Sequence, residues 1–261
     1  MPEVSLIVST YNWPEALRLC LMSISAQDKY PDEVIIADDG SGQETRQLIE
    51  QMQQSFPVPL KHVYQDDNGF RKTIILNKAV KAAAGSYIVQ IDGDVILNRH
   101  FIKDHLQIAE PSVFVRGTRA HIAAAIHPGV FSRSEIRFSW WSGGIINRFN
   151  ALRIPLLSFL FEKKIKNSER VRGSNLAYWK SDFIQVNGYN NELTGWGHED
   201  EELAARFINN NILKKVTKFR AIQFHLIHRT ASWDQEQRHT TEVQNTLANR
   251  VKICLNGYEK F

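Results

Sequence analysis

Cysteine is rare in this sequence. The 261 residues include only two cysteines, Cys20 and Cys254, which are far apart and lie in helix-like patterns. We therefore expect buried, reduced thiols rather than a disulfide or a metal-binding pair. The first ten residues also lack the basic and apolar regions of an export signal, so the expected location is the cytoplasm.

Long apolar runs, low-complexity tracts and internal repeats are absent as well. No apolar run reaches the roughly 20 residues that a membrane-spanning helix needs. The net charge is +4, from 32 basic and 28 acidic residues, which is too small to indicate a nucleic-acid-binding protein. With 43% hydrophobic residues, the chain can form one large α/β domain with a sizeable core.

Glycine is missing from the turn that follows the first predicted strand, residues 4–9. The turn reads Thr10-Tyr11-Asn12-Trp13-Pro14, which excludes a dinucleotide-binding fingerprint and a P-loop. Pro14 instead predicts the start of a helix, with Asn12 or Trp13 as its cap.

Residues 86–95 are the most informative part of the sequence. They have the pattern of a buried strand and contain Asp92-Gly93-Asp94. In open α/β sheets, ligands bind at the carboxyl ends of the strands. Two carboxylates on a tight glycine turn can hold a divalent cation, and the cation can hold a diphosphate. The alternative interpretation is an Asp-Gly turn that closes a β-hairpin.

Strand and helix patterns alternate over the first 118 residues. Strands are predicted at residues 4–9, 34–37, 60–64, 86–95 and 113–118, and helices from Pro14 and at 43–54, 73–84 and 98–109. This alternation predicts a Rossmann-like α/β fold, with a mainly parallel sheet and helices on both faces. Because parallel strands share one carboxyl edge, Tyr11, Asp39 and Arg71 should lie beside Asp92 and Asp94.

Residues 137–172 combine positive charge with aromatic and aliphatic side chains. Eight basic residues against Glu162 and Glu169 give this segment a charge of +6. Such a surface can meet anionic lipid headgroups or an anionic acceptor, and peripheral contact with the inner face of the cell membrane is one expectation. The alternative is a flap whose apolar residues pack on the core, and Pro155 interrupts any long amphipathic helix.

A second chemical stretch runs from Gly195 to Glu202, where four acidic residues open an amphipathic helix pattern. The helix dipole alone favours acidic residues in a first turn. It does not explain the Gly-Trp-Gly sequence before them, in which two glycines leave Trp196 free to stack on a flat partner such as a sugar face.

His225 and His228 follow a strand that is predicted at residues 219–224. In an unbroken strand, residues three apart face opposite sides. Both histidines could therefore bind one metal ion only if the strand ended between them, and from the residues alone we expect one ligand.

In this order, these motifs resemble the family 2 glycosyltransferases of GT-A fold. The resemblance rests on Thr10-Tyr11-Asn12, Asp38-Asp39-Gly40-Ser41, Asn68-Gly69-Phe70-Arg71, Asp92-Gly93-Asp94, residues 195–200 and His228. The second half is similar to the galactosyltransferase-type carboxyl-terminal region of chondroitin polymerases and β-1,4-galactosyltransferases. The family implies a GT-A fold, a UDP-sugar donor, and a glycan or lipid-linked glycan acceptor.

By this resemblance, the residues that bind the donor and acceptor are Thr10, Tyr11, Asn12, Asp39, Arg71, Asp92 and Trp196. Tyr11 would stack on uracil, while Asp39 and Arg71 would contact the base. Asp92 would lie near the ribose and the donor sugar, and Trp196 would form the acceptor platform.

The resemblance also implies a metal site and a catalytic base. Asp94 would coordinate Mn²⁺ or Mg²⁺, His228 matches the family's metal-binding histidine, and His225 occupies the position of a second ligand. Imidazole suits a transition metal better than magnesium, which favours manganese. Asp200 matches the base and Glu199 the neighbour that holds hydroxyl groups.

One position departs from the family pattern, because His198 stands where galactosyltransferases carry glycine. We expect residues 1–118 to bind the nucleotide sugar. Residues 119–261 would form the acceptor-binding and catalytic half of the same domain, with the flap at 137–172.

Our hypothesis is an inverting, metal-dependent transferase that moves a hexose or N-acetylhexosamine from its UDP form onto a surface polysaccharide or lipopolysaccharide. A retaining enzyme would require a second carboxylate near the anomeric carbon, and Glu199 leaves that alternative open. A carboxylate takes the proton of the acceptor hydroxyl, and a metal ion stabilises the departing diphosphate. A nucleotide-sugar hydrolase, a nucleotidyltransferase and a non-catalytic glycan-binding module are the alternatives.

Overall fold

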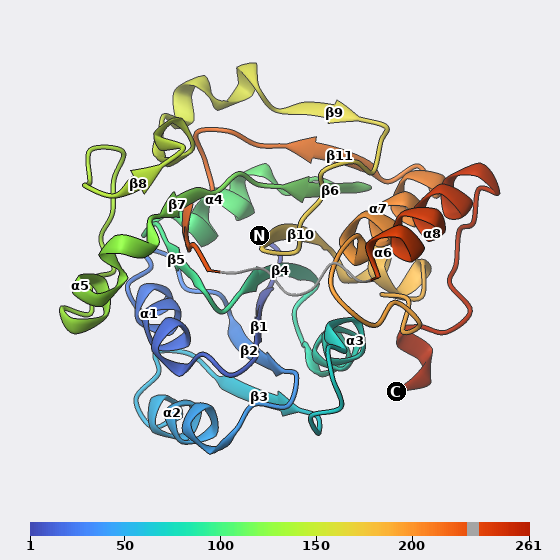
Figure 1. Cartoon of the computed structure of the whole chain (residues 1–261). Coiled ribbons are helices and arrows are strands. Elements are labelled where there is room, and N and C mark those ends of the chain that lie inside the picture. The colour runs from blue at the N-terminus through green and yellow to red at the C-terminus, as the bar shows by residue number, and fades with distance from the viewer. Residues whose placement is uncertain (229–234) are drawn as a thin grey trace.

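The computed structural model describes residues 1–228 and 235–261, and it contains two sheets in that part of the chain (Figure 1). The large sheet has eight strands in the order β3-β2-β1-β4-β10-β6-β11-β9 among the described residues. Its strands are β1 Val4–Thr10, β2 Glu33–Asp38, β3 Leu60–Tyr64, β4 Tyr87–Asp92, β6 Val113–Arg116, β9 Lys163–Ile165, β10 Asn175–Trp179 and β11 Leu213–Val216. The neighbours β3, β2, β1 and β4 are parallel, as predicted, whereas β10 runs antiparallel to both β4 and β6.

Helices cover both faces of the large sheet (Figure 1). They are α1 Pro14–Ser25, α2 Gln43–Gln53, α3 Lys72–Ala82, α4 Phe101–Ile108, α5 His127–Ser132, α6 Lys180–Gln185, α7 Glu199–Asn209 and α8 Glu236–Ala248. Side chains alternate along a strand, so Leu6 packs with α1, α2 and α4, while Ile7 packs with α3, α6 and α7. The expected α/β fold is therefore present, and α8 lies against α7.

The small sheet has the order β5-β12-β7-β8 in the described part of the chain. Its strands are β5 Val95–Leu97, β7 Ala120–Ile122, β8 Ile145–Ile146 and β12 Gln223–Leu226. The strand predicted at 86–95 ends at Asp92, and the chain resumes as β5 after the turn at Gly93. Because β4 pairs with β1 and β10 while β5 pairs with β12, the Asp-Gly turn does not close a hairpin.

Two sequence-based assignments in the second half are wrong. The last strand begins at Gln223 rather than residue 219, because Phe219 and Ala221 have φ angles of 63° and 50°, which an extended strand does not allow. The strand β11 was not predicted, because Lys214 and Lys215 give it a polar pattern. Both lysines are nevertheless buried, and Lys215 pairs with Glu110 at 2.9 Å.

Other expectations concern the cysteines and residues 137–172. Cys20 and Cys254 are both buried and are not bonded to each other, as predicted. Residues 137–172 contain no α-helix, and Pro155 begins the 3₁₀ helix η3 Pro155–Leu160. The other 3₁₀ helices are η1 Ala124–Ile126, η2 Arg148–Ala151 and η4 Tyr258–Lys260. Across residues 1–228 and 235–261, no helix has the length and apolar character needed to cross a membrane.

Candidate active site

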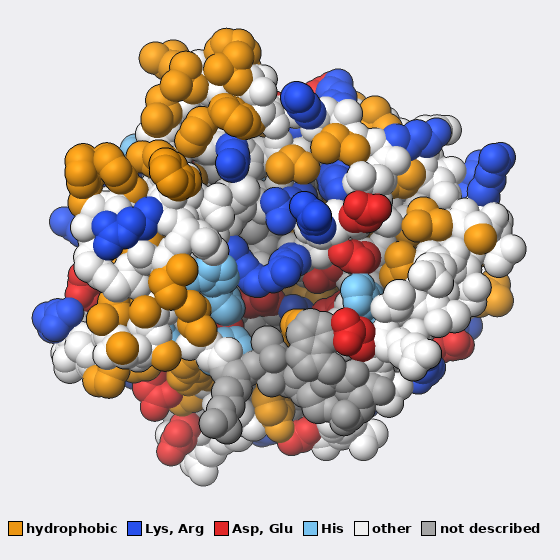
Figure 2. Space-filling view, turned by 45° about the horizontal axis from the view of Figure 1, so that its top comes forward, with side chains coloured by type: hydrophobic (Ala, Val, Ile, Leu, Met, Phe, Trp, Pro, Cys, Tyr) orange, Lys and Arg blue, Asp and Glu red, His pale blue; other side chains and the backbone are white. Residues whose placement is uncertain are grey.

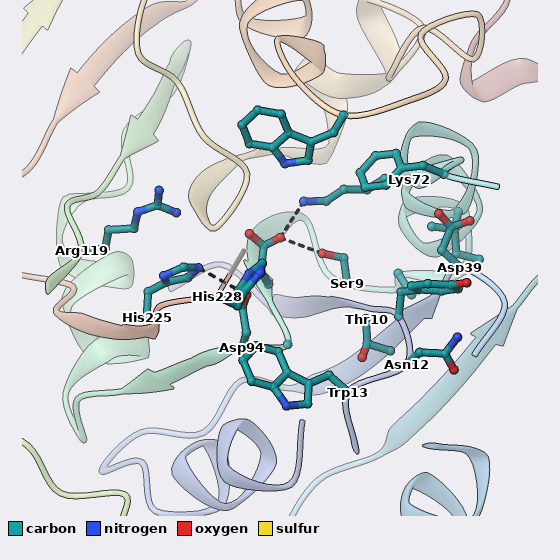
Figure 3. Close-up of a pocket in the computed structure, with 17 residues that line it drawn as sticks. Ser9, Thr10, Asn12, Trp13, Asp39, Lys72, Asp94, Arg119, His225 and His228 are labelled. Carbon is teal, nitrogen blue, oxygen red and sulfur yellow. Dashed lines mark hydrogen bonds and ion pairs between the residues drawn. The ribbon is translucent and has the colours of Figure 1, made fainter. Parts of the chain in front are cut away.

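A cavity of about 580 Å³ opens at the carboxyl edge of the large sheet (Figure 3). We call it the strand-end cavity. Nine residues that the sequence singled out line it, namely Thr10, Tyr11, Asn12, Asp39, Asp92, Asp94, Trp196, His225 and His228. Side chains from both halves of the chain, and from both sheets, therefore meet at one place, as the strand order predicted for the first half.

Asp94, His225 and His228 form a cluster on one side of this cavity. The Nε2 atom of His228 lies 2.8 Å from Asp94 Oδ2, and that of His225 lies 3.3 Å from the same oxygen. One ligand atom from each residue falls within 4.8 Å of the other two. The three side chains can therefore face a single ion.

The end of β12 explains why both histidines reach Asp94. The strand stops at Leu226, between the two histidines, which is the condition under which both can serve one metal ion. The backbone N–H of Leu226 donates to the Asp94 carbonyl oxygen at 3.0 Å, which holds β12 beside the aspartate. Trp13 packs edge-on against the His228 ring.

The chemistry of the cluster fits a divalent transition metal. One carboxylate and two imidazoles suit manganese better than magnesium, which prefers oxygen ligands. Asp94 Oδ1 is buried and has no hydrogen-bond partner among the described residues. Burial opposes ionisation of Asp94, but its contacts with His225 and His228 outweigh burial and hold its pKa below the usual range.

Asp92 is held differently from Asp94, although only Gly93 separates them. Asp92 Oδ1 accepts hydrogen bonds from Ser9 Oγ at 2.8 Å and from Lys72 Nζ at 2.6 Å (Figure 3). A Cβ atom at position 93 would lie 3.1 Å from the Ser9 carbonyl oxygen, so glycine permits this close approach.

Lys72 is a site residue that the sequence analysis missed. Burial lowers its pKa, but the charges of Asp92, Asp200 and Glu199 outweigh burial and raise the pKa above the usual range. The ammonium group is thus the positive centre among three carboxylates. Its position as the first residue of α3, at the carboxyl edge of the sheet, was the signal that could have identified it.

The adjacent residues Asp38 and Asp39 have separate roles. Asp38 is fully buried and bonds the backbone N–H of Ser41 and the His62 ring, so it stabilises the end of β2. Asp39 lines the cavity, accepts hydrogen bonds from Gln65 and from the backbone N–H of Arg71, and has a pKa raised by burial.

The first turn presents Tyr11 at the cavity mouth. Its ring is 52% exposed, and its hydroxyl donates to Asp67 Oδ2 at 2.9 Å. Asn12 has a φ angle of 47° and accepts a hydrogen bond from the backbone N–H of Gly42, which ties the two loops together. Trp13 is the cap residue of α1, one of the two predicted candidates.

Arg71 does not line the strand-end cavity. Its side chain donates to the Asp66 carbonyl oxygen, and its backbone N–H bonds Asp39 at 2.8 Å. The structure thus connects Arg71 to the cavity through Asp39.

The acidic residues Glu199 and Asp200 of α7 are buried and are not among the residues that line the strand-end cavity. Asp200 accepts hydrogen bonds from the Gly173 N–H at 2.6 Å and from the Tyr189 hydroxyl at 2.8 Å. Burial raises the pKa of Asp200, while Lys72 works in the opposite direction. Burial and the charge of Asp200 raise the pKa of Glu199 to about 7. A carboxylate with a raised pKa is a stronger base at neutral pH.

The Gly-Trp-Gly sequence adopts a backbone that requires its glycines. Gly195 and Gly197 have φ angles of 93° and 111°, and His198, the cap residue before α7, has a φ of 63°. This turn brings Trp196 to the cavity, which it lines together with residues of the first turn.

Arg119 is the second residue that the sequence did not single out. It lies in the connection between β6 and β7 and extends into the strand-end cavity on the side of His225 (Figure 3). No local sequence motif marks Arg119, because its proximity to Asp94 depends on how the small sheet packs against the large one.

Two models of known protein families match this chain. The family model described as "Glycosyl transferase family 2" matches residues 5–152, and the model described as "N-terminal domain of galactosyltransferase" matches residues 159–229. The two matches confirm the resemblances that the motifs of the two halves indicated.

Curated relatives are similar over most of the chain at low identity. Chondroitin synthase of Escherichia coli is 22% identical over 231 residues, which cover 78% of this chain and 32% of that protein. Validoxylamine A glucosyltransferase of Streptomyces hygroscopicus subsp. limoneus is 24% identical over 242 residues, which cover 84% and 50%. The chain therefore spans a third to a half of these relatives.

Solved structures confirm the GT-A fold. A mannosyltransferase from Pyrobaculum calidifontis in complex with GDP-Man and Mn²⁺ has a TM-score of 0.65 at 18% identity, with 95% of this chain and 64% of that chain covered. Staphylococcus aureus TarS 1–349 in complex with UDP has a TM-score of 0.63 at 16% identity, with 99% and 68% covered. Because the family 2 model matches more than half of the sequence, this chain belongs to glycosyltransferase family 2 and is a transferase enzyme.

Proposed function

We propose that this enzyme is an inverting, metal-dependent glycosyltransferase that uses a UDP-sugar. The proposal rests on how these side chains are arranged around the strand-end cavity. The cluster of Asp94, His225 and His228 lines the same cavity as Lys72, and the charge of Asp200 acts on Lys72. Lys72 thus links the cavity of the proposed metal site to the proposed base. The donor sugar would be a hexose or an N-acetylhexosamine.

The donor would be held mainly by residues 1–118. Tyr11 is exposed enough to stack on uracil, and the Asp39 carboxylate, which Arg71 positions through its backbone, would contact the base. Thr10 and Asn12 form the turn beside it, and Asp92 would meet the ribose and the donor sugar. Residues 119–261 would supply the acceptor side, with Trp196 as the platform for an acceptor sugar.

Asp94, His225 and His228 would hold Mn²⁺, which the donor set favours over Mg²⁺. A divalent ion at this position supplies positive charge that stabilises the departing diphosphate. Lys72 adds a second, permanent positive charge on the side of Asp92.

Asp200 would act as the base. As the acceptor oxygen forms a bond to the anomeric carbon, its proton passes to the Asp200 carboxylate. The bond from the anomeric carbon to the diphosphate oxygen breaks, and its electron pair leaves with UDP. A single displacement of this kind inverts the anomeric configuration. Glu199, its neighbour at the start of α7, would hold donor or acceptor hydroxyl groups.

A panel of UDP-sugars and GDP-sugars, each with Mn²⁺ and glycan acceptors, tests the proposal by nucleotide release. We expect release with a UDP-sugar only when an acceptor is present, and a product of inverted configuration by NMR. Equal release without an acceptor would instead identify a nucleotide-sugar hydrolase. If Mn²⁺ does not change UDP binding at all, a glycan-binding module becomes the better account.

The acceptor is proposed to belong to a cell-surface polysaccharide or lipopolysaccharide, and residues 141–161 to touch the membrane that carries it. Their large apolar side chains are exposed, with Leu156 at 86%, Phe149 at 78% and Trp141 at 71%. They form part of the hydrophobic surface seen in Figure 2. Ion pairs of Arg153 with Asp104 and of Lys164 with Glu110 reduce the charge of +6 that the sequence gives residues 137–172.

Sedimentation with vesicles tests this membrane contact. Vesicles rich in anionic lipid should pull down the protein more than neutral vesicles, because apolar insertion and basic residues act together. The variant Phe149→Ser with Leu156→Ser should reduce the bound fraction, while Leu255→Ser, a change at another exposed leucine, should not. A protein that stays in solution with both vesicle types has no such contact.

A further inference from the structure

A second cavity, of about 320 Å³, adjoins the strand-end cavity and shares Arg119 with it. We call it the basic cavity. Its cationic side chains are Arg116, Arg119, Arg172 and Lys218, and no aspartate or glutamate is among the described residues that line it. Figure 2 shows Lys and Arg side chains gathered along one rim of the central hollow, beside acidic and histidine side chains.

None of these four cations forms an ion pair with any residue that the structure describes. Arg119 donates to Ser174 Oγ at 3.2 Å and Arg116 to the Arg170 carbonyl oxygen at 3.0 Å, which are both neutral acceptors. The Lys218 ammonium lies 5.6 Å from the centre of the Phe161 ring. Like charges held together without counter-ions destabilise a fold unless a ligand of opposite charge occupies the site.

The positive charges of the basic cavity also repel one another. Burial lowers the pKa of Arg116, and the positive charges of Arg172, Arg119 and Arg170 lower it further. Burial and the charge of Arg172 also lower the pKa of Arg119, although Asp92, Asp94 and Asp200 partly oppose them. A bound anion would counteract the repulsion between the guanidinium groups.

Neutral hydrogen-bonding groups of the cavity are unsatisfied too. Thr118 Oγ1 and His121 Nδ1 are buried, and neither has a hydrogen-bond partner in the described part of the chain. An imidazole ring and a hydroxyl can both bind an oxyanion beside the guanidinium groups.

The basic cavity lies next to the proposed base. Gly173, whose N–H bonds Asp200, is flanked in sequence by Arg172 and Ser174, which both line the basic cavity. A Cβ atom at Gly173 would lie 2.7 Å from Asp200 Oδ1, so the chain passes tightly against the carboxylate. A molecule anchored in the basic cavity is therefore close to Asp200.

We propose that the basic cavity binds a phosphate group of the acceptor, so that the acceptor is a phosphorylated glycan or a glycan carried on a lipid diphosphate. This inference rests on the proposed transferase function. A carboxylate would neutralise only one of four positive charges, whereas a phosphate or diphosphate carries more charge and offers oxygens to several guanidinium groups at once. Arg119, shared by both cavities, would lie between the acceptor phosphate and the donor.

Binding of inorganic phosphate and pyrophosphate, measured by calorimetry without metal ion at constant ionic strength, is the first test. Arg172→Gln and Lys218→Gln should each weaken binding about tenfold, because each removes a charge-assisted contact. Lys163→Gln, which removes an exposed charge outside the cavity, should bind like the wild type. No binding by the wild type, or equal binding by all variants, overturns the proposal.

The same measurement excludes the donor as the source of the phosphate. Saturating UDP with Mn²⁺ should leave phosphate binding in place, because the two ligands occupy different cavities. Displacement of phosphate by UDP and Mn²⁺ would mean that the basic cavity is part of the donor site. Circular dichroism of each variant separates lost binding from lost folding.

An acceptor series then distinguishes the two phosphate sources. The probes are a free hexose, its 6-phosphate, and a hexosyl diphosphate on an alkyl chain, each scored by nucleotide release. Phosphorylated probes should be used at least about tenfold better than the free hexose, and the better of the two identifies the source. A preference for the free hexose contradicts the inference alone, whereas no release with any donor or acceptor contradicts the proposed transferase.

Discussion

The two cavities at the carboxyl edge of the sheet differ in how their charges are balanced. In the strand-end cavity, Lys72 pairs with Asp92, and both histidines contact Asp94. Four cations line the basic cavity, and no ion pair joins them to any described residue. A balanced site can persist without a ligand, whereas an unbalanced one is more stable with a ligand bound. We therefore expect the strand-end cavity to control chemistry and the basic cavity to control which acceptor is chosen.

The largest expected effect is at Asp200, whose charge acts on Lys72 of the strand-end cavity and whose carboxylate accepts a hydrogen bond from Gly173, next to the basic cavity. Asp200→Asn keeps the shape of the side chain but removes the base, so kcat should fall by about 10²- to 10⁴-fold. Asp28→Asn, the same change at a residue that pairs with Arg99, is the matched control and should keep normal transfer. Normal turnover by a folded Asp200→Asn enzyme would falsify its role as the base.

A smaller effect is expected at the metal cluster. His228→Ala should weaken Mn²⁺ binding, measured by calorimetry, by about 10- to 100-fold, because one of three protein ligands is lost. Phosphate binding in the basic cavity should not change, which sharpens the distinction between the cavities. His100→Ala, at a histidine that pairs with Asp28 outside both cavities, is the control. Unchanged Mn²⁺ affinity in His228→Ala would remove this histidine from the site.

Tyr11 tests the nucleotide side of the strand-end cavity. Tyr11→Ala should weaken UDP binding about tenfold, since stacking of a base on an aromatic ring contributes about 1–3 kcal/mol. Tyr11→Phe keeps the ring and loses only the hydroxyl contact with Asp67, so it should bind nearly like the wild type. If both variants bind equally weakly, the hydroxyl matters and stacking is not the cause.

The smallest effect concerns stability. The folded chain holds the proton of Glu199 up to a pH of about 7, whereas an exposed glutamate ionises near 4.5. Between these two values the unfolded chain binds fewer protons, so the free energy of unfolding falls as pH rises and then levels off. Glu199→Gln removes the free-energy cost of ionising a buried carboxylate. The variant should therefore be more stable than the wild type by about 1–2 kcal/mol at pH 8.

Urea unfolding at pH 4.5 and pH 8 measures this difference between the two pH values. Near pH 4.5 the variant and the wild type should be similar, and Glu50→Gln, at an exposed residue of α2, should show no pH-dependent gain. A Glu199→Gln variant that is less stable at pH 8 would show that the ionised carboxylate is stabilised rather than strained.

The regular first half explains why much of the fold could be predicted. Strands and helices alternate there, so the positions of Asp39, Asp92 and Asp94 at one edge followed from topology. The fold of the second half was harder to predict, because β11 contains two buried lysines and the chain before β12 turns at two non-glycine residues with positive φ. Neither the hydrophobic pattern nor the secondary-structure propensity of the residues indicates these features.

The candidate site shows the same limit. Motifs identified residues that follow strands, including Tyr11 and Asp94, and the acids of α7. They did not reveal Lys72 or Arg119, whose significance depends on partners far away in the sequence. Whether a cation has an acidic partner that is distant in the sequence can be seen only in the tertiary structure.

The turn at Gly93 separates two neighbouring aspartates into different structural units. Asp92 ends a strand of the large sheet, whereas Asp94 precedes β5 and His225 lies in β12 of the small sheet, with His228 just beyond that strand. The proposed metal ligands therefore all belong to the small sheet, while the proposed nucleotide contacts belong mainly to the large one. Gly93 joins the two sets along the chain, so a change in the packing between the sheets would move the proposed metal position relative to the nucleotide contacts.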